Sequence, residues 1–383
     1  MYNFSFYNSV KIIFGKDTIK QLSDEIPADL RILLVYGGGS IKLNGVYNQI
    51  MEALKGRVVF EFSGIEVNPV YETCLEGIKL IKEKHIDFIL AAGGGSVIDA
   101  SKFMAIASCA DGDLWDILSM GRLPEKALPL GTILTIPATG TEMNGNAVIT
   151  NRTLLKKDSF STPLVYPQFS ILDPEITYTL PARQIANGVV DAFVHTTEQY
   201  LTFPVNAQIQ DRFAESILNI LVKNGEQALK TPKDYDVRAN LMWASTWALN
   251  GWIGQGVPQD WATHQIGHEL TAFYGLDHAQ TLAIVLPGIL DTLLEQKAAK
   301  LIQLGEAVFG ITEGSPMERA SATVRAIESF FQRMGIGTRL SDYGLGEEAV
   351  KAVTERTKER GWVMGENRNI TPEVVETILR SRL

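Results

Sequence analysis

Short apolar runs alternate with helical patterns through the first half of the chain, and this alternation constrains the fold more than any other feature. In residues 71–85, the apolar side chains of Cys74, Leu75, Ile78 and Ile81 fall on one face of a helix. The runs that predict strands are "RILLVYGGGS" (31–40), "VVFEFSGI" (58–65), the start of "DFILAAGGGSVIDASKFMAIA" (87–107), "GTILTIPATGTE" (131–142) and "FSILD" (169–173). Strands that alternate with helices predict βαβ units and a largely parallel sheet.

The character of the sequence changes after "LDPEITYTLP", where long helical patterns replace strand-like runs. "ARQIANGVVDAFVHTTEQYL" predicts one helix, with Pro181 at its first turn, and "DVRANLMWASTWALNGW" predicts another. A length of 383 residues suits two domains. We predict an α/β N-terminal domain over residues 1–178, with a Rossmann-like, largely parallel sheet, and an all-α C-terminal domain over residues 179–383.

Composition excludes several classes of partner. The net charge is −9 and no stripe of Lys and Arg appears, which argues against nucleic-acid binding. Two cysteines do not form a disulfide framework. The N-terminus lacks the pattern of a secretory signal, and no apolar run reaches the ~18 residues of a membrane span. We therefore expect a cytoplasmic protein that does not act at a membrane.

Two GGGS turns, at 37–40 and 93–96, each follow a predicted strand. Glycine lets the backbone approach a phosphate closely, and the free N–H groups at a helix start attract the anion. One such turn is more often a tight connection without a ligand, but two at the ends of parallel strands favour a nucleotide. Neither turn is GxGxxG. The candidate contacts are Gly37, Gly38, Gly39, Ser40, Gly94, Gly95 and Ser96, with Asp99 placed either to bond a ribose or to interact with the helix dipole.

The first turn also bears on which cofactor binds. Enzymes that use NAD commonly place an acid against the adenosine ribose, and this acid repels a 2′-phosphate. No acid lies between Gly37 and Asn44, whereas Ser40 and Lys42 are available as donors. The sequence therefore favours NADP(H).

Four of the five histidines gather in the helical half together with an aspartate. Asp191 and His195 are spaced i, i+4, as are His264 and His268, and His278 follows. "HQIGH" lacks the glutamate base of the zinc proteases. Each pair alone is more simply a surface or core contact, but together these side chains offer imidazole and carboxylate ligands for Fe²⁺, Zn²⁺, Co²⁺ or Ni²⁺. Five candidates compete for about four ligand positions, and an open position would make a Lewis-acid site.

The chain resembles the iron-containing (group III) alcohol dehydrogenases, most closely their NADPH-dependent butanol dehydrogenase and broad-specificity aldehyde reductase branch. The resemblance covers essentially the full length and implies a dehydroquinate synthase-like architecture and a homodimer. The motifs that support the resemblance are "IIFGK", both GGGS turns, "TIPATGTE", "LPARQIANGVVDAFVHTTEQY" and "GVPQDWATHQIGHELTAFYGLDHAQTLAIVLP".

The resemblance assigns roles to individual residues. It implies that a divalent metal, Fe²⁺ or Zn²⁺, is held by Asp191, His195, His264 and His278 and polarises the oxygen of an aldehyde or alcohol while hydride passes to or from NADP(H). His268 then lies beside the nicotinamide with a role in proton transfer. Glycine at position 39 is typical of the NADP-dependent relatives. Further cofactor contacts are implied at Asn68, Thr135, Thr139 and Lys157.

Three other functions compete with this reading. A lyase or synthase of the same superfamily should surround its metal with Lys and Arg for an acidic substrate, but "NGWIGQGVPQDWATHQIGHEL" and "FYGLDHAQ" contain none. A metallohydrolase would leave the two glycine turns without a role. A metal- or nucleotide-binding protein without catalytic activity is the third alternative.

Overall fold

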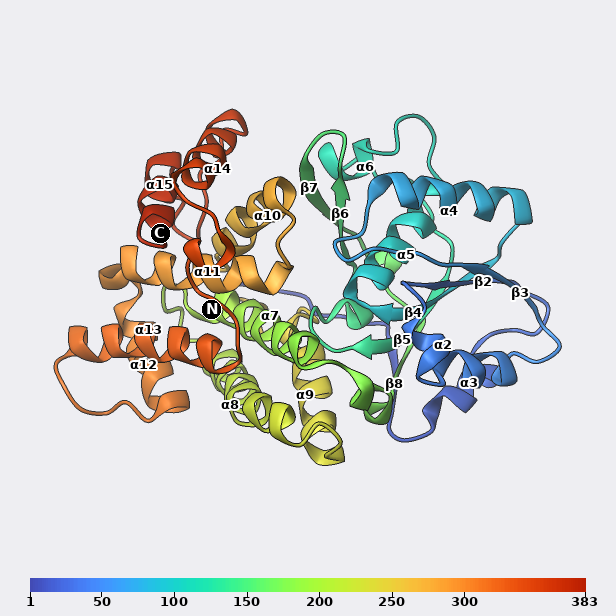
Figure 1. The fold of residues 1–383 in the computed structure, drawn as a ribbon, viewed down its shortest axis with the longest axis horizontal. Coiled ribbons are helices and arrows are strands. Elements are labelled where there is room, and N and C mark those ends of the chain that lie inside the picture. The colour runs from blue at the N-terminus through green and yellow to red at the C-terminus, as the bar shows by residue number, and fades with distance from the viewer. The chain divides into compact units, whose positions relative to one another are not determined.

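In the computed structural model, which describes residues 1–383, the five predicted strands pair, together with the unpredicted strand β1, into a six-stranded sheet in the order β1-β8-β5-β4-β2-β3 (Figure 1). Every pair in this sheet is parallel, which confirms the predicted α/β fold. The six strands are β1 (Lys11–Phe14), β2 (Arg31–Tyr36), β3 (Val58–Phe62), β4 (Phe88–Gly94), β5 (Leu130–Ile136) and β8 (Phe169–Leu172).

The sheet is buried on both faces because alternate side chains of each strand enter two separate cores. Leu33 and Val35 of β2 pack in one core with residues of α4 and α5. Ile32 and Leu34 pack in the other with residues of η1 and α3. The helical segments of this unit are η1 (Thr18–Gln21), α1 (Leu22–Glu25), α2 (Ser40–Leu43), α3 (Val46–Ala53), α4 (Tyr71–Lys84), α5 (Gly95–Ala107), α6 (Asp116–Ser119), η2 (Thr141–Met143), η3 (Pro163–Val165) and η4 (Pro174–Thr179).

A second, two-stranded sheet is an element that the sequence did not predict. β6 (Asn146–Asn151) and β7 (Lys156–Ser161) pair as an antiparallel hairpin. Its inward residues Ala147, Ile149 and Phe160 join the core that contains α5. The hairpin carries Lys157, one of the predicted cofactor contacts.

The remaining chain is helical, as predicted, with no strand after β8. Its helices are α7 (Ala182–Tyr200), α8 (Gln208–Lys230), α9 (Tyr235–Ala248), α10 (Ala262–Tyr274), α11 (His278–Thr292), α12 (Leu294–Phe309), α13 (Pro316–Arg333), η5 (Ser341–Tyr343), α14 (Glu347–Glu359) and α15 (Pro372–Arg380). α11 packs against α7, α10, α13 and α15, and Ile284, Val285 and Ile289 of α11 are buried. None of the helices combines the length and the apolar character that a bilayer crossing requires.

Two compact units account for these elements. One comprises Tyr7–Pro181 with Pro232–Thr246, and we refer to it as the α/β unit. The other comprises Met1–Phe6, Ala182–Thr231 and Trp247–Leu383, and we refer to it as the helical unit. The first six residues therefore belong with the helices, and most of α9 belongs with the sheet.

Candidate metal centre

The helix α7 supplies the first two residues of the predicted metal site. Asp191 and His195 lie one turn apart on its buried face, and each is only 4% exposed. The apolar neighbours Val190 and Val194 are fully buried, so this segment forms the core-facing side of the helix. A carboxylate in such surroundings needs a compensating partner.

The helices α10 and α11 supply the other histidines. His264 lies in the first turn of α10, and His278 is the first residue of α11. The two helices approach closely at Gly267, where a Cβ would lie only 2.8 Å from Thr281 Oγ1. Glycine at this position allows the helices to pack with their histidines on adjoining surfaces.

The structure brings Asp191, His195, His264 and His278 together. One candidate ligand atom from each lies within 4.8 Å of all the others. Asp191 Oδ1 is 3.5 Å from His195 Nδ1 and 3.6 Å from His278 Nε2. The ring centres of His195 and His264 are 4.5 Å apart. Three segments distant in sequence therefore direct one carboxylate and three imidazoles to one point.

The donor atoms fit a divalent cation. His195 Nδ1 and His264 Nε2 are buried and have no hydrogen-bond partner, a costly state unless something else satisfies them. Burial, and then the neighbouring His264, hold the pKa of His195 well below its ordinary value. His195 is therefore neutral at pH 7 and offers a lone pair, as a metal ligand must. With no thiolate among the donors, the set suits Fe²⁺ or Zn²⁺.

A polar clamp fixes the start of α11 and hence His278. Asp277 forms a capping box with Gln280. Its carboxylate also accepts two hydrogen bonds from Arg183 at 2.9 Å and one from Asn187 at 2.8 Å. The first turns of α7 and α11 are thereby joined immediately before His278.

The predicted catalytic residue lies at the edge of this cluster. His268 follows His264 by one turn of α10 and is half-buried. Its ring centre is 5.3 Å from that of His278 and 6.3 Å from that of His264. His268 is thus close enough to act on a small molecule held by the cluster.

The two glycine turns are neighbours in the α/β unit. The strands β2 and β4 pair directly, and a Cβ at Gly37 would lie 3.8 Å from Val97 in the first turn of α5. The helix α5 begins at Gly95, and its N-cap, Gly94, supplies no side chain to bond the first N–H groups. A Cβ at Gly95 would lie 2.7 Å from Thr139 Oγ1, so these two predicted contacts are adjacent. Free N–H groups at a helix start suit a pyrophosphate.

Three other predicted cofactor contacts of the α/β unit, Asn68, Asp99 and Lys157, form hydrogen bonds with protein groups. Lys157 donates a hydrogen bond of 2.9 Å to Asn68 Oδ1, which brings together two residues far apart in sequence. Thr135 is buried on β5. Asp99 accepts from Thr141 Oγ1 at 2.6 Å and from the Val148 N–H at 3.0 Å. The Asp99 carboxylate therefore ties α5 to the hairpin, a role that neither sequence-based alternative included.

Lys42, predicted to be an available donor, is paired in the structure. Its Nζ lies 3.0 Å from Glu61 Oε2. Glu61 also accepts hydrogen bonds of 2.6 Å from Tyr36 and from Tyr47, which hold the pKa of its carboxyl below the usual value. An ionised carboxylate therefore stands close to the first glycine turn, although none lies between Gly37 and Asn44.

A buried ionic cluster supports the start of α10. Lys297 donates hydrogen bonds of 2.7 Å to Asp260 Oδ2 and 3.0 Å to both carboxylate oxygens of Glu366. Asp260 Oδ1 in turn accepts from the Ala262 N–H at 3.0 Å, in the first turn of α10. Burial, and then the hydrogen bond with Asp260, raise the pKa of Glu366 to about 7.

The protonation of Glu366 gives an expected pH dependence of stability. Because its pKa is higher in the folded protein than its usual value of 4.5, the stabilisation is complete below about pH 4.5 and is lost as the pH rises towards 7. The pKa of Asp260 is lowered, so the ionisation of Asp260 changes the stability only at lower pH. Glu366→Gln cannot release this proton, so its free energy of unfolding should fall less between pH 5 and 8 than that of the wild type. Urea titrations across this range test the expectation, with Glu376→Gln, whose side chain is 40% exposed, as a control that keeps the wild-type slope.

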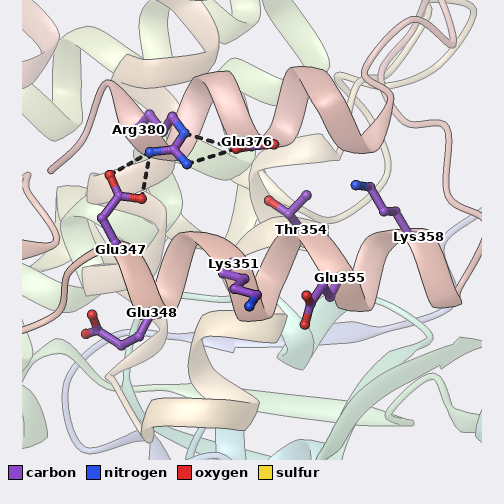
Figure 2. Close-up of a pocket in the computed structure, with 8 residues that line it drawn as sticks. All are labelled: Glu347, Glu348, Lys351, Thr354, Glu355, Lys358, Glu376 and Arg380. Atoms are coloured by element: carbon purple, nitrogen blue, oxygen red, sulfur yellow. Dashed lines mark hydrogen bonds and ion pairs between the residues drawn. The ribbon is translucent and has the colours of Figure 1, made fainter.

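A groove of about 430 Å³ between α14 and α15 is a separate feature of the helical unit. Figure 2 shows that charged side chains line it and that Arg380 points at Glu347 and Glu376. Acids and bases alternate there, and several are already paired. None of the predicted site residues lines the groove, so the four-residue cluster remains the candidate site.

Several residues that support these sites were missed by sequence reasoning. Glu198 hydrogen-bonds to His264 Nδ1. It lies seven residues after Asp191 on α7, so helical periodicity offered a signal. Lys102 is fully buried and donates to backbone carbonyls of Thr141 and Asn144, and burial lowers its pKa to about 7. The sequence around Lys102, which follows Asp99 by three residues on α5, does not predict that this side chain is buried.

Comparison with known proteins identifies the family. The model "Iron-containing alcohol dehydrogenase" matches residues 9–174, and "Fe-containing alcohol dehydrogenase family, C-terminal" matches residues 185–383. The chain is 53% identical over 382 residues to the NADPH-dependent aldehyde reductase YqhD of Escherichia coli K12, covering 99% of each. A crystal structure of YqhD has a TM-score of 0.98 at 52% identity and covers 100% of this chain and 99% of that one. NADH-dependent butanol dehydrogenase A of Thermotoga maritima has a TM-score of 0.95 at 37% identity, with coverages of 100% and 99%. The chain therefore belongs to the iron-containing alcohol dehydrogenase family, and it is an oxidoreductase of alcohols and aldehydes.

Proposed function

We propose that this protein is an NADP(H)-dependent reductase of aldehydes, which also oxidises primary alcohols, with one divalent metal held by Asp191, His195, His264 and His278. The convergence of these four donor groups within 4.8 Å is the observation that carries the proposal. The 53% identity to an enzyme named NADPH-dependent aldehyde reductase supports the substrate class and the cofactor. In this proposal residues 1–178 bind the cofactor and residues 179–383 hold the metal.

The bound groups supply the central chemistry: the metal would polarise the carbonyl oxygen, and NADPH would supply the hydride. The protein holds and orients the reactants. Asp191 would contribute a carboxylate oxygen to the ligand set, and the three histidines would contribute imidazole nitrogens. His268 has the position to deliver a proton to the oxygen of the reduced substrate, directly or through water.

The uncapped start of α5 supports a pyrophosphate site at Gly94, Gly95 and Ser96. The bond from Lys157 to Asn68 supports a common role for these two residues near the cofactor. We further propose Thr135 and Thr139 as contacts, since Thr139 adjoins Gly95.

The preference for the 2′-phosphate should depend on Gly37, Gly38, Gly39 and Ser40. Gly39 has a φ of +97°, and no atom lies within 4 Å of a Cβ placed there. An aspartate at this position would have room for its side chain but would strain the backbone by about 1 kcal/mol. The effect of its charge can therefore be separated from the strain only with a neutral variant of the same shape.

Gly39→Asp should shift the cofactor preference from NADPH towards NADH by at least about tenfold. The reason is that a carboxylate repels a 2′-phosphate and can hydrogen-bond a ribose hydroxyl. Gly39→Asn carries the same backbone strain without the charge and should change the preference much less. The measurement is the ratio of kcat/KM with NADPH to kcat/KM with NADH. An equal shift in both variants would mean that the 2′-phosphate lies elsewhere.

We further propose that the bound metal is iron or zinc, that the enzyme is a homodimer, and that it works in the cytoplasm. Iron and zinc both suit the donor set, and their availability would decide which is bound. The family resemblance supports a homodimer, which light scattering of the purified protein would test. Both cysteines, Cys74 and Cys109, are free thiols, which fits the reducing cytoplasm in which we propose that the enzyme works.

Consumption of NADPH on addition of butanal is the direct test of this function. In an assay with metal-replete protein, the absorbance of NADPH should fall only when the aldehyde is present. Chelator treatment should abolish the reaction, and Fe²⁺ or Zn²⁺ should restore it. A metal-replete, folded protein that reduces no member of an aldehyde panel with either NADPH or NADH would contradict the proposal.

A further inference from the structure

Glu198 is a buried carboxylate on the same helix face as two proposed metal ligands. It follows Asp191 by seven residues and His195 by three, so all three side chains leave α7 on one side. The residue is only 3% exposed. Neither the proposed metal ligation nor the proposed proton transfer uses this carboxylate.

Both carboxylate oxygens of Glu198 bond to the first turn of α10. Oε1 accepts a hydrogen bond of 2.6 Å from the Thr263 N–H, and Oε2 is hydrogen-bonded to Nδ1 of His264. The backbone carbonyl of Glu198 also accepts from the Asp260 N–H at 2.9 Å. One residue of α7 therefore fixes the position of the α10 N-terminus and the orientation of the His264 ring.

The chemistry of this contact determines the tautomer of His264. With Oε2 of Glu198 as the acceptor of this hydrogen bond, Nδ1 of His264 carries the proton. Nε2 then keeps its lone pair, and this atom is buried without a hydrogen-bond partner. A carboxylate behind an imidazole also makes that imidazole a more basic ligand.

We infer that Glu198 is a positioning residue of the metal centre: it holds His264 in the Nδ1–H tautomer with Nε2 directed at the metal. This inference rests on the proposed function, since it requires that the four-residue cluster binds a metal. It predicts that Glu198 controls metal affinity more strongly than it controls folding.

The test compares the dissociation constants of Zn²⁺ for metal-free wild type and variants, measured by competition with a chromogenic chelator. Glu198→Gln keeps the shape of the side chain and removes its charge, and it should weaken Zn²⁺ binding by about 10–100-fold. Glu215→Gln is the matched control, because Glu215 is a buried carboxylate of the same unit that accepts from Tyr200 at 2.9 Å, away from the cluster. This control should leave the Zn²⁺ affinity within about threefold of the wild type, even if it lowers the Tm of the metal-free protein.

The outcomes separate this inference from the proposed function. If His264→Ala does not reduce the Zn²⁺ affinity of the protein, the proposed metal site itself is wrong. If His264→Ala reduces it but Glu198→Gln does not, or if Glu198→Gln and Glu215→Gln reduce it equally, the role of Glu198 is wrong.

A second measurement uses the wild type and does not depend on whether a variant folds. In zinc-loaded protein with ¹⁵N-labelled histidine, the shifts of His264 should be those of a protonated Nδ1 and a metal-bound Nε2. A metal-bound Nδ1, or a proton on Nε2, would overturn the inference.

Discussion

His264→Ala should lower kcat/KM for aldehyde reduction by about 10³-fold or more, on the scale of losing an electrophilic group in a preorganised site. The substitution removes one of four donors that lie within 4.8 Å of one another. It also leaves the buried carboxylate of Glu198 without its imidazole partner. The purified variant should accordingly contain much less metal than the wild type.

Binding of NADPH should survive this substitution. The residues that we assign to the cofactor belong to the α/β unit, whereas His264 belongs to the helical unit. The dissociation constant of NADPH, measured by quenching of protein fluorescence, should stay within about threefold of the wild-type value. The control is His85→Asn, which changes an exposed histidine at the end of α4 and should keep full activity. Full activity in a metal-depleted His264→Ala protein would rule out the metal-dependent mechanism.

Lys297→Met should destabilise the helical unit by about 3–5 kcal/mol, the usual cost of leaving a buried charge, here that of Asp260, without its partner. The Lys297 side chain is only 2% exposed and is the cation that lies between Asp260 and Glu366. Methionine fills a similar volume but donates no hydrogen bond to these carboxylates or to the carbonyl of Leu201, which Lys297 bonds at 2.7 Å.

Urea unfolding followed by a helix signal measures this loss. The matched control is Lys300→Met on the same helix. Lys300 pairs with Asp211, whose side chain is 21% exposed, so water can solvate the carboxylate that remains. The loss in Lys300→Met should therefore be smaller. Equal losses in the two variants would show that the buried cluster contributes nothing beyond an ordinary ion pair.

The sequence predicted five of the six strands of the sheet and the histidines and aspartate of the candidate site, because both depend on local patterns. Apolar runs ending in glycine identified β2 and β4, and i, i+4 spacing identified the pairs at Asp191 and His264. Spacing alone left five candidates for four ligand positions, and only the family resemblance separated His268 from the others. In the structure, the other four residues each place one candidate ligand atom within 4.8 Å of all the others.

What the sequence did not predict depends on contacts between distant segments or on weak local signals. The strands of the β6–β7 hairpin contain Asn146, Lys156 and Asp158, so they lack the apolar character used to find the other strands. Lys297 meets Asp260 across 37 residues and Glu366 across 69, and each looks like a solvated surface charge in the sequence. The residues of the first glycine turn do not predict Glu61, because this acid lies on the neighbouring strand β3.

Anomalous X-ray diffraction from crystals of the active, metal-loaded protein, recorded at the absorption edge of the bound metal, tests the central claim most directly. We expect one peak per chain, coordinated by the carboxylate of Asp191 and by the imidazoles of His195, His264 and His278. A peak bound by other residues, or no peak in protein that still reduces butanal with NADPH, would contradict the claim that this cluster holds the catalytic metal.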